Sequence, residues 1–273
     1  MIRQAIIPLA GLGTRLLPLT SIIPKELLPI NGKPGLEYIL DECIEAGIKE
    51  IILIVSPKKK IIKKYFFNDS FYKKILMKKK DKRIENVYKK ILKYKKMIKF
   101  VYQNNPIGTG DAVLQTKKFI KDKFFLMVLA DDLIINKNCS KSMITVHKKY
   151  KCSVMASMAV NRKTVSRWGI YKINRKLYSS NFLISDVVEK PSIKNSPSNK
   201  AVIGRYILPK SIFKKLEIQK KGHGGEFHIT DAIRALISDD HKFVGHTFSG
   251  KYLDCGTMNG YINSSVEISK LFD

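Results

Sequence analysis

Short, continuous apolar runs alternate with helix-like segments through the first half of the chain. Four such runs have the length and composition of buried strands. They are residues 4–9, 50–55, 98–102 and 124–130. Segments 36–46 and 108–121 fit helices, and Gly47 follows the first as a C-terminal cap. This alternation predicts βαβ units and therefore an α/β fold, with a Rossmann-like, mostly parallel mixed sheet flanked by helices.

The second half has shorter elements and no linker rich in Pro, Gly or Ser. Strands are expected at 153–160, 168–173, 184–189, 201–208 and 243–248, and helices at 209–220, 229–238 and 257–271. Ser192–Asn199 is the expected long loop. With 273 residues, 44% of them hydrophobic, the chain can bury a sizeable core. We expect a single domain over 1–273.

The charge of the chain is strongly positive. It has 51 Lys and Arg against 23 Asp and Glu, for a formal net charge of +28, and residues 58–97 are its most lysine-rich part. Apolar residues recur among these lysines, which favours a helical excursion with a solvated face over an RNA-binding arm. Specific nucleic-acid readers use Arg and interleaved aromatic residues. Because Lys predominates here, we expect no specific nucleic-acid partner, but a surface suited to anionic substrates.

Segments that would direct the chain to a membrane or a secretory route are not evident. No apolar run approaches the roughly 18–20 residues of a membrane span, and the start is not a signal peptide. The cysteines are scattered without a C-x-x-C pair, and no H-E-x-x-H arrangement occurs. We expect a soluble, cytoplasmic protein with reduced thiols and no zinc centre.

A glycine-containing loop follows the first predicted strand. In Leu9–Arg15 the glycines allow the backbone amides to approach a phosphate chain. The loop is not G-x-G-x-x-G, because Leu16 stands at the third glycine, and it is not a P-loop. A tight turn would equally explain it. Lys25 and Lys33 follow soon after, each next to proline, and two such cations could clamp a triphosphate.

Two aspartates have the setting of Mg²⁺ ligands. Asp131 ends an apolar strand, and Asp254 lies in a Leu-Asp-Cys-Gly turn after the last strand. Mg²⁺ takes one or two carboxylates together with substrate phosphates and waters. A helix cap or a turn is the alternative for Asp131, and we expect Asp132 to be such an N-cap rather than a ligand.

One stretch, AGLGTRLLPLTSIIPKELLPINGKP at residues 10–34, closely resembles the signature of bacterial UTP–glucose-1-phosphate uridylyltransferases. These enzymes belong to the sugar-nucleotide pyrophosphorylases, with the nucleotide-diphospho-sugar transferase fold. Further matches span nearly the whole chain in the family's order. They include Gln103 with Gly108-Thr109-Gly110, Leu129-Ala130-Asp131-Asp132, Trp168-Gly169, Val188-Glu189-Lys190-Pro191, Gly204-Arg205-Tyr206 and Asp254-Cys255-Gly256.

The resemblance implies an enzyme that forms UDP-glucose and pyrophosphate from UTP and glucose 1-phosphate, with Mg²⁺ as cofactor. The implied nucleotide-binding residues are Ala10, Gly11, Gly13, Glu26, Gln103 and Gly108, with Gln103 at the uracil edge. Arg15 and Lys25 would hold the triphosphate, and Lys190 the sugar phosphate. Gly169 and Glu189 would meet the sugar, and Asp131 and Asp254 would hold the metal. A homo-oligomer, either a dimer or a tetramer, is also implied.

Some positions depart from the family's pattern. Trp168 stands where tyrosine is usual, Asp111 stands near a position that often carries histidine, and Phe227-His228 replaces Ile-Gln. These departures affect the expected sugar pocket more than the reaction. A thymidylyltransferase and a non-catalytic regulatory relative with the same fold remain the alternatives.

Overall fold

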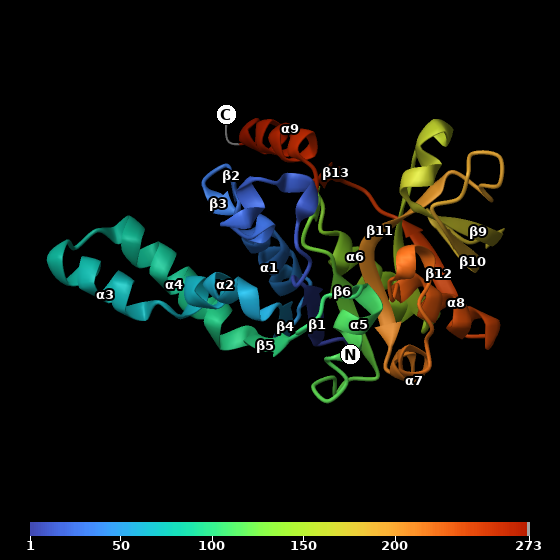
Figure 1. Cartoon of the computed structure of the whole chain (residues 1–273), viewed down its shortest axis with the longest axis horizontal. Helices are drawn as coiled ribbons and strands as arrows, with labels where there is room; N and C mark the ends of the chain where they lie inside the picture. The colour runs from blue at the N-terminus through green and yellow to red at the C-terminus, as the bar shows by residue number, and fades with distance from the viewer. Residues whose placement is uncertain (272–273) are drawn as a thin grey trace.

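A nine-stranded sheet forms the centre of the computed structural model, which describes residues 1–271 apart from the side chain of His223 (Figure 1). In spatial order its strands are β5 (Ile98–Tyr102), β4 (Glu50–Val55), β1 (Gln4–Pro8), β6 (Phe124–Val128), β11 (Lys200–Pro209), β8 (Ser153–Ala159), β12 (Phe243–Thr247), β10 (Asn181–Glu189) and β9 (Gly169–Lys176).

The first half of the chain builds the parallel part of this sheet. β5, β4, β1 and β6 pair in parallel, with Ile6 opposite both Ile52 and Met127. β11 and β10 run against the other strands, and β12 pairs in parallel with β8. The prediction of a mostly parallel mixed sheet is confirmed. Because parallel neighbours need crossover connections, helices are carried onto the faces of the sheet.

Both faces of the sheet are buried, as the apolar runs predict. Successive residues of a strand point to opposite faces, so Ala5 and Ile7 enter one hydrophobic cluster while Ile6 enters another. Helices with residues in the first cluster include α1 (Gly35–Glu45), α2 (Lys60–Phe67), α4 (Lys82–Met97) and α6 (Cys139–Tyr150). Helices with residues in the second are α5 (Thr109–Leu114), α7 (Ile212–Glu217) and α8 (Ile229–Ser238).

Two short ribbons lie outside the main sheet. β2 (Pro29–Ile30) pairs with β3 (Lys33–Pro34), and β7 (Asp132–Ile135) pairs with β13 (Lys251–Asp254). The prediction of Asp132 as a helix N-cap is wrong, because Asp132 begins β7. Asp254 does not lie in a turn but ends β13, in register with Asp132. The ribbon therefore brings the segment after β6 against the end of β13.

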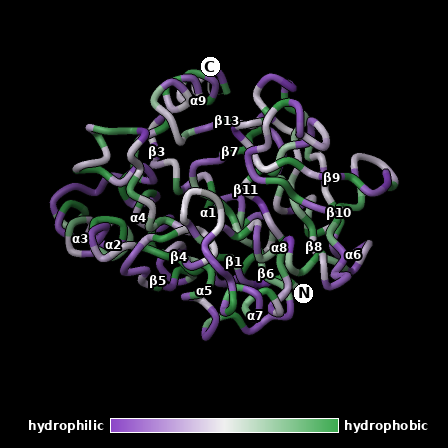
Figure 2. The backbone as a smooth tube through the Cα atoms, turned by 45° about the vertical axis from the view of Figure 1, so that its right-hand side comes forward, coloured by the Kyte–Doolittle hydropathy of each residue, from purple (hydrophilic) through white to green (hydrophobic). Residues whose placement is uncertain are grey.

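The last helix, α9 (Met258–Ser269), lies at the sheet edge opposite the N-terminus. Figures 1 and 2 both show α9 and β13 at the end of the molecule away from the start of β1. The Tyr261 hydroxyl donates to the carbonyl oxygen of Pro29 at 2.6 Å, which ties α9 to β2. This edge is where β1 and β6 end, and open α/β sheets bind their ligands at such an edge.

The lysine-rich segment consists of helices. With α2 and α4, α3 (Asp69–Lys78) extends away from the sheet (Figure 1). Figure 2 shows hydrophilic and hydrophobic residues side by side along α2 and α3. In the described part of the chain, no helix is long and apolar enough to cross a membrane.

Candidate active site

A cavity of about 420 Å³ opens where β1 and β5 end. The loop after β1 forms one wall, with Ala10, Gly11 and Gly13 among the lining residues. Gly108 lines the opposite wall. Gly108 has φ 136° and lies so close to the Phe227 carbonyl that a Cβ atom would be 2.4 Å from its oxygen. Only glycine fits there. We call this cavity the first hollow.

The wall of the first hollow near Glu26 is held by a buried ion pair. Glu26 is 3% exposed, and both of its carboxylate oxygens accept from Lys59 Nζ at 2.9 Å. The same ammonium group donates to the Leu9 carbonyl oxygen at 2.7 Å. Burial lowers the pKa of Lys59, although the nearby Glu26 acts against this shift. Lys59 therefore joins the end of β1 to Glu26. In this it differs from the solvated lysines that the sequence predicts for segment 58–97.

Asp131 faces two cations at the floor of the first hollow. Its Oδ2 atom accepts from Lys25 Nζ at 2.5 Å and lies 4.0 Å from an Arg15 guanidinium nitrogen. Burial alone would raise the pKa of Asp131, but the charge of Lys25, with a smaller contribution from Arg15, holds that pKa below its usual value. For Lys25 burial works the other way, yet Asp131 and Glu26 raise its pKa. Both groups are therefore charged near neutral pH.

The Asp131 and Asp254 carboxylates converge on Gly256. A Cβ atom at Gly256 would lie 3.0 Å from Asp131 Oδ2, 3.1 Å from Asp254 Oδ1 and 3.2 Å from Arg15 Nη2. The absence of a side chain at Gly256 thus allows the two carboxylates and the guanidinium group to lie close together. Two carboxylates with open positions beside them fit Mg²⁺, which completes its shell with phosphate oxygens and water. Among residues 1–271, no group of three or more His, Cys, Asp and Glu side chains is placed to hold a metal ion.

A buried network fixes the backbone on both sides of Asp131. Arg205 is fully buried and donates to the carbonyl oxygens of Leu129 at 3.3 Å and Asp132 at 2.7 Å. The Asp132 carboxylate accepts from the Gly204 amide at 2.8 Å and the Tyr252 hydroxyl at 2.7 Å. Burial, followed by the adjacent Asp131 charge, raises the pKa of Asp132 to about 6. Asp132 is thus a structural partner of β11 and β13.

Gln103 lines the first hollow directly after β5 and is 3% exposed. Its amide nitrogen donates to Asp111 Oδ2 at 2.5 Å and to the Gly108 carbonyl oxygen at 3.2 Å. The N–H donors of this amide are therefore used within the protein. The carbonyl oxygen of the Gln103 amide is the polar atom left for a ligand.

A second hollow, of about 580 Å³, adjoins the first at Asp254. Arg167, Trp168 and Tyr252 line it, together with the first residues of α9. The Trp168 and Tyr252 rings meet edge to face with centroids 5.7 Å apart. Asp131 lines the first hollow and Asp254 the second, so the two carboxylates that converge on Gly256 belong one to each hollow.

The residues expected from the sequence to meet the sugar lie next to the second hollow, at the ends of β9 and β10. Gly169 is paired with Glu189 in the β9–β10 register. The Lys190 amide donates to the Trp168 carbonyl oxygen at 2.9 Å, and its side chain is exposed. Glu189 and Lys190 are not among the described residues that line either hollow. The structure therefore groups Arg15, Lys25, Asp131 and Asp254. It places Gly169 on β9 and Glu189 on β10, with Lys190 directly after β10.

Sequence reasoning missed several residues of this region. Lys59 is one lysine among many, and Asp111 stands out in the sequence only as a departure from the family's pattern. Tyr252 and Arg167 carry no motif. Lys59 and Tyr252 acquire their positions through contacts with segments distant in the sequence, so no local signal could have identified them.

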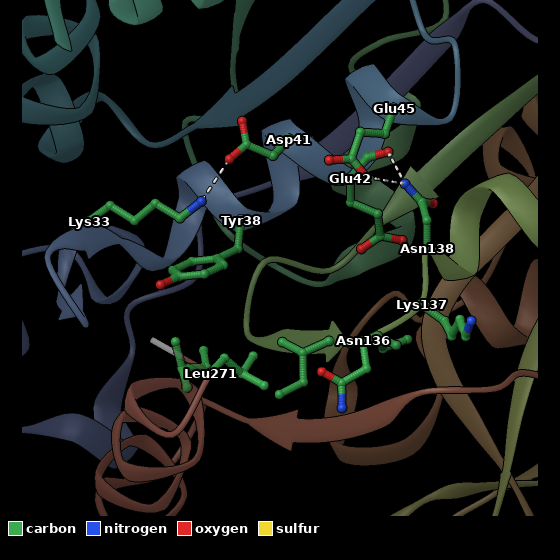
Figure 3. Close-up of a pocket in the computed structure, with 12 residues that line it drawn as sticks. Lys33, Tyr38, Asp41, Glu42, Glu45, Asn136, Lys137, Asn138 and Leu271 are labelled. Carbon is green, nitrogen blue, oxygen red and sulfur yellow. Dashed lines mark hydrogen bonds and ion pairs between the residues drawn. The ribbon is translucent and has the colours of Figure 1, made fainter. Parts of the chain in front are cut away.

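A third hollow of about 340 Å³ lies between α1, β7 and α9 (Figure 3). Several of the polar groups drawn there bind one another. Lys33 Nζ lies 2.7 Å from Asp41, and Asn138 donates to Glu45 at 3.2 Å and to the Glu42 carbonyl oxygen at 3.0 Å. These pairs join β3 and the residue before α6 to α1, and we assign the candidate site to the first two hollows.

Comparison with known proteins agrees with this geometry. The chain is 36% identical over 268 residues to a UTP–glucose-1-phosphate uridylyltransferase of Mycoplasma pneumoniae, covering 97% of this chain and 91% of the relative. It is similar to a UDP-glucose pyrophosphorylase solved in complex with UDP-glucose, with a TM-score of 0.88, 35% identity and 99% of each chain covered. It is also similar to the UTP-bound UGPase from Acinetobacter baumannii, with a TM-score of 0.88, 31% identity and coverage of 98% and 93%. The nucleotidyl transferase family model matches residues 4–270, and the chain belongs to that family.

Proposed function

We propose that this chain transfers the uridylyl group of UTP to glucose 1-phosphate, forming UDP-glucose and releasing pyrophosphate. The observation that carries the proposal is the convergence of Asp131, Asp254, Arg15 and Lys25 at the junction of two hollows. Two phosphate-bearing substrates that react with each other need such a charged junction. The relative from Mycoplasma pneumoniae is named for this activity, and a similar chain was solved with UDP-glucose.

The nucleotide would occupy the first hollow. The backbone of Ala10, Gly11 and Gly13 would follow its phosphates, because glycines allow close approach of amide groups. Gln103 and Gly108 would meet the base from the opposite wall. Arg15 and Lys25 lie toward the junction, where the triphosphate would place its charge. Glu26 also lines this hollow, held in place by Lys59.

Glucose 1-phosphate would approach from the side of the second hollow. The Glu189 carboxylate would accept from sugar hydroxyls, and the backbone at Gly169 would allow the sugar to come close. Lys190, which follows β10 directly, would bind the sugar phosphate. Trp168 and Tyr252 offer aromatic surface beside Asp254, which suits the apolar face of a sugar ring.

The reaction requires positioning and charge neutralisation more than proton transfer. A phosphate oxygen of glucose 1-phosphate is already ionised near neutral pH, so it attacks the α-phosphorus of UTP without a general base. The new P–O bond forms as the bond to the oxygen leading to the β-phosphorus breaks, and pyrophosphate leaves in line. Lys25 and Arg15 stabilise the charge that develops on the phosphates. Asp131 and Asp254 would hold Mg²⁺, which supplies further positive charge to the phosphate oxygens when bound.

Pyrophosphate release, measured with a panel of nucleoside triphosphates and sugar 1-phosphates, tests the proposal. We expect UTP with glucose 1-phosphate to be the best pair. A site that binds the ribose 2′-hydroxyl and excludes the extra methyl group should prefer UTP over dTTP by ~100-fold or more in kcat/KM. Equal use of dTTP would identify a thymidylyltransferase instead. No release with any pair would favour a non-catalytic relative.

A further inference from the structure

The direction in which the Gln103 amide presents itself is fixed by its protein neighbours. A side-chain amide has two N–H donors on one side and a carbonyl acceptor on the other. Both neighbours of this amide, the Asp111 carboxylate at 2.5 Å and the Gly108 carbonyl at 3.2 Å, are acceptors. The nitrogen must therefore face them, since an oxygen there would meet two other oxygens. Both N–H donors are consumed, and within residues 1–271 no group donates to the Gln103 carbonyl oxygen.

Asp111 is itself held in the position that this arrangement needs. It lies in the first turn of α5, and its second oxygen accepts from Gln115 Nε2 at 3.1 Å, one turn further along the helix. The start of α5 is anchored in turn by Gly110, whose amide donates to the Phe227 carbonyl oxygen at 2.7 Å. Asp111 is thus a fixed acceptor behind Gln103. A residue able to donate as well as accept would not impose a direction on the amide.

We propose that Asp111 is a positioning residue that turns the carbonyl oxygen of the Gln103 amide toward the nucleotide base and so selects a base with a hydrogen-bond donor on its ring. The inference rests on the proposed function, because it assigns the first hollow to the nucleotide. Uracil has an N3–H donor, whereas cytosine has an unprotonated N3 acceptor. An acceptor facing N3 pairs with uracil and repels cytosine. Thymine has the same N3–H group, so this device separates UTP from CTP and not from dTTP.

The test is calorimetric titration of the full-length protein with UTP and with CTP in the presence of Mg²⁺. We expect wild-type protein to bind UTP at least about tenfold more tightly than CTP, as an unpaired buried polar group would require. In Asp111→Asn the amide at position 111 can donate or accept, so only the longer contact to Gly108 orients Gln103. The UTP-to-CTP affinity ratio should then fall several-fold toward unity. Asp111→Ala, which removes the acceptor altogether, should lower the ratio in the same direction.

Gln115→Ala is the matched control. It removes the other partner of Asp111 and leaves the Gln103 contact in place, so the affinity ratio should stay within about twofold of wild type. The KM for glucose 1-phosphate should be unchanged in all three variants, since the sugar side does not contact Asp111. Thermal unfolding of each variant identifies any loss of fold.

Two outcomes would overturn the inference: an unchanged affinity ratio in folded Asp111→Asn, or an equal loss of UTP and CTP binding, which a purely structural role would produce. The proposed function fails separately. If wild-type protein binds UTP over CTP in the expected ratio but releases no pyrophosphate, the proposed reaction is contradicted and the selection of the base by Gln103 is supported. Wild-type protein that binds neither nucleotide would contradict both.

Discussion

The Asp131 carboxylate is largely shielded from water yet charged, because Lys25 and Arg15 compensate for the lost hydration. That arrangement suits a group that binds a cation when substrate phosphates arrive. We expect Asp131→Asn and Asp254→Asn each to lower kcat by ~100-fold or more, since a removed charge-stabilising contact commonly costs about 3–4 kcal/mol. EDTA should abolish activity and added Mg²⁺ should restore it. The measurement is steady-state pyrophosphate release.

Asp122→Asn provides a matched control for these variants. Asp122 precedes β6, at the strand end opposite to Asp131, and binds the Arg3 side chain at 3.1 Å. Its replacement should leave kcat close to wild type. Near wild-type rates in both Asp131→Asn and Asp254→Asn would remove these residues from the metal site.

Lys25 and Lys190 should affect different substrates. Lys25 lies in the first hollow against Asp131, whereas Lys190 follows β10 beside Trp168. Lys25→Ala should mainly lower kcat or weaken UTP use, and Lys190→Ala should mainly raise the KM for glucose 1-phosphate. Kinetics with each substrate varied in turn will distinguish them, with Lys194→Ala as an exposed control in the nearby loop. Identical kinetic profiles for Lys25→Ala and Lys190→Ala would contradict this division.

Individual residues could be predicted from the sequence where a motif carried them, and not where their function depends on a distant contact. Asp131 and Asp254 stand in recognisable positions at the ends of strands. Lys59 resembles its solvated neighbours, and only the fold places it against Glu26, 33 positions earlier. The prediction of Asp132 as a helix N-cap is wrong, because a polar residue that follows a strand can equally begin a short two-stranded ribbon such as β7–β13.

Among the elements, α1 and β11 are joined by one buried ion pair. Arg205 binds both oxygens of Glu42, at 3.0 Å and 2.8 Å, and also holds the carbonyl groups on either side of Asp131. Removing one partner leaves an uncompensated buried charge. We expect Glu42→Ala to lower the free energy of unfolding at pH 7 by about 3–5 kcal/mol, measured by urea denaturation. Glu217→Ala, which removes an exposed pair with Lys117, should leave unfolding nearly unchanged.

The pH dependence of this pair has a defined sign. Arg205 holds the pKa of Glu42 below its usual value of 4.5, despite the opposing effect of burial. Because the pKa of Glu42 is lower in the folded than in the unfolded state, its ionisation stabilises the folded state at pH values above the unfolded-state pKa. This stabilisation is lost as the pH falls through the folded-state pKa. The wild-type advantage over Glu42→Ala should therefore shrink below about pH 4.5. An advantage that persists unchanged in strong acid would contradict the ion-pair account.

The apolar runs predicted the long strands because full burial on both faces leaves a continuous hydrophobic signal. The short ribbons escaped prediction for the opposite reason. β7 and β13 have four residues each and are partly exposed, so neither gives a clear hydrophobic pattern. The two strands also pair across more than 100 positions, which no local pattern shows. α5 is shorter than the predicted 108–121 segment, since its last turn leads into tight turns from Gln115 onward. The local hydrophobic pattern therefore identifies the buried elements. It predicts less well the short elements at the edge of the sheet, where the candidate site lies.

Over the whole molecule, the lysines that carry the surplus positive charge are of two kinds, solvated and structural, which the sequence does not distinguish. Lys78, Lys79 and Lys80 lie exposed where α3 ends, and Lys89 pairs only with Glu85 on the same helix. Lys90 differs, because it binds Glu37 at 3.0 Å and Asp41 at 3.1 Å and so ties α4 to α1. The lysine-rich segment is therefore solvated at its tip and structural near the sheet.

Replacing Lys78, Lys79, Lys80 and Lys89 together with Gln should leave kcat within a few-fold of wild type, since surface changes away from buried contacts usually have small effects. Lys90→Gln should instead lower the thermal unfolding temperature, because it leaves the Glu37 carboxylate without its cation and leaves Asp41 with Lys33 alone. Any RNA binding by wild-type protein should be non-specific and should disappear as salt is added, because released counterions drive it. Filter binding across a salt series measures this. Tight, sequence-selective RNA binding at physiological salt that the fourfold Gln variant abolishes would show instead that the exposed lysines form a nucleic-acid surface.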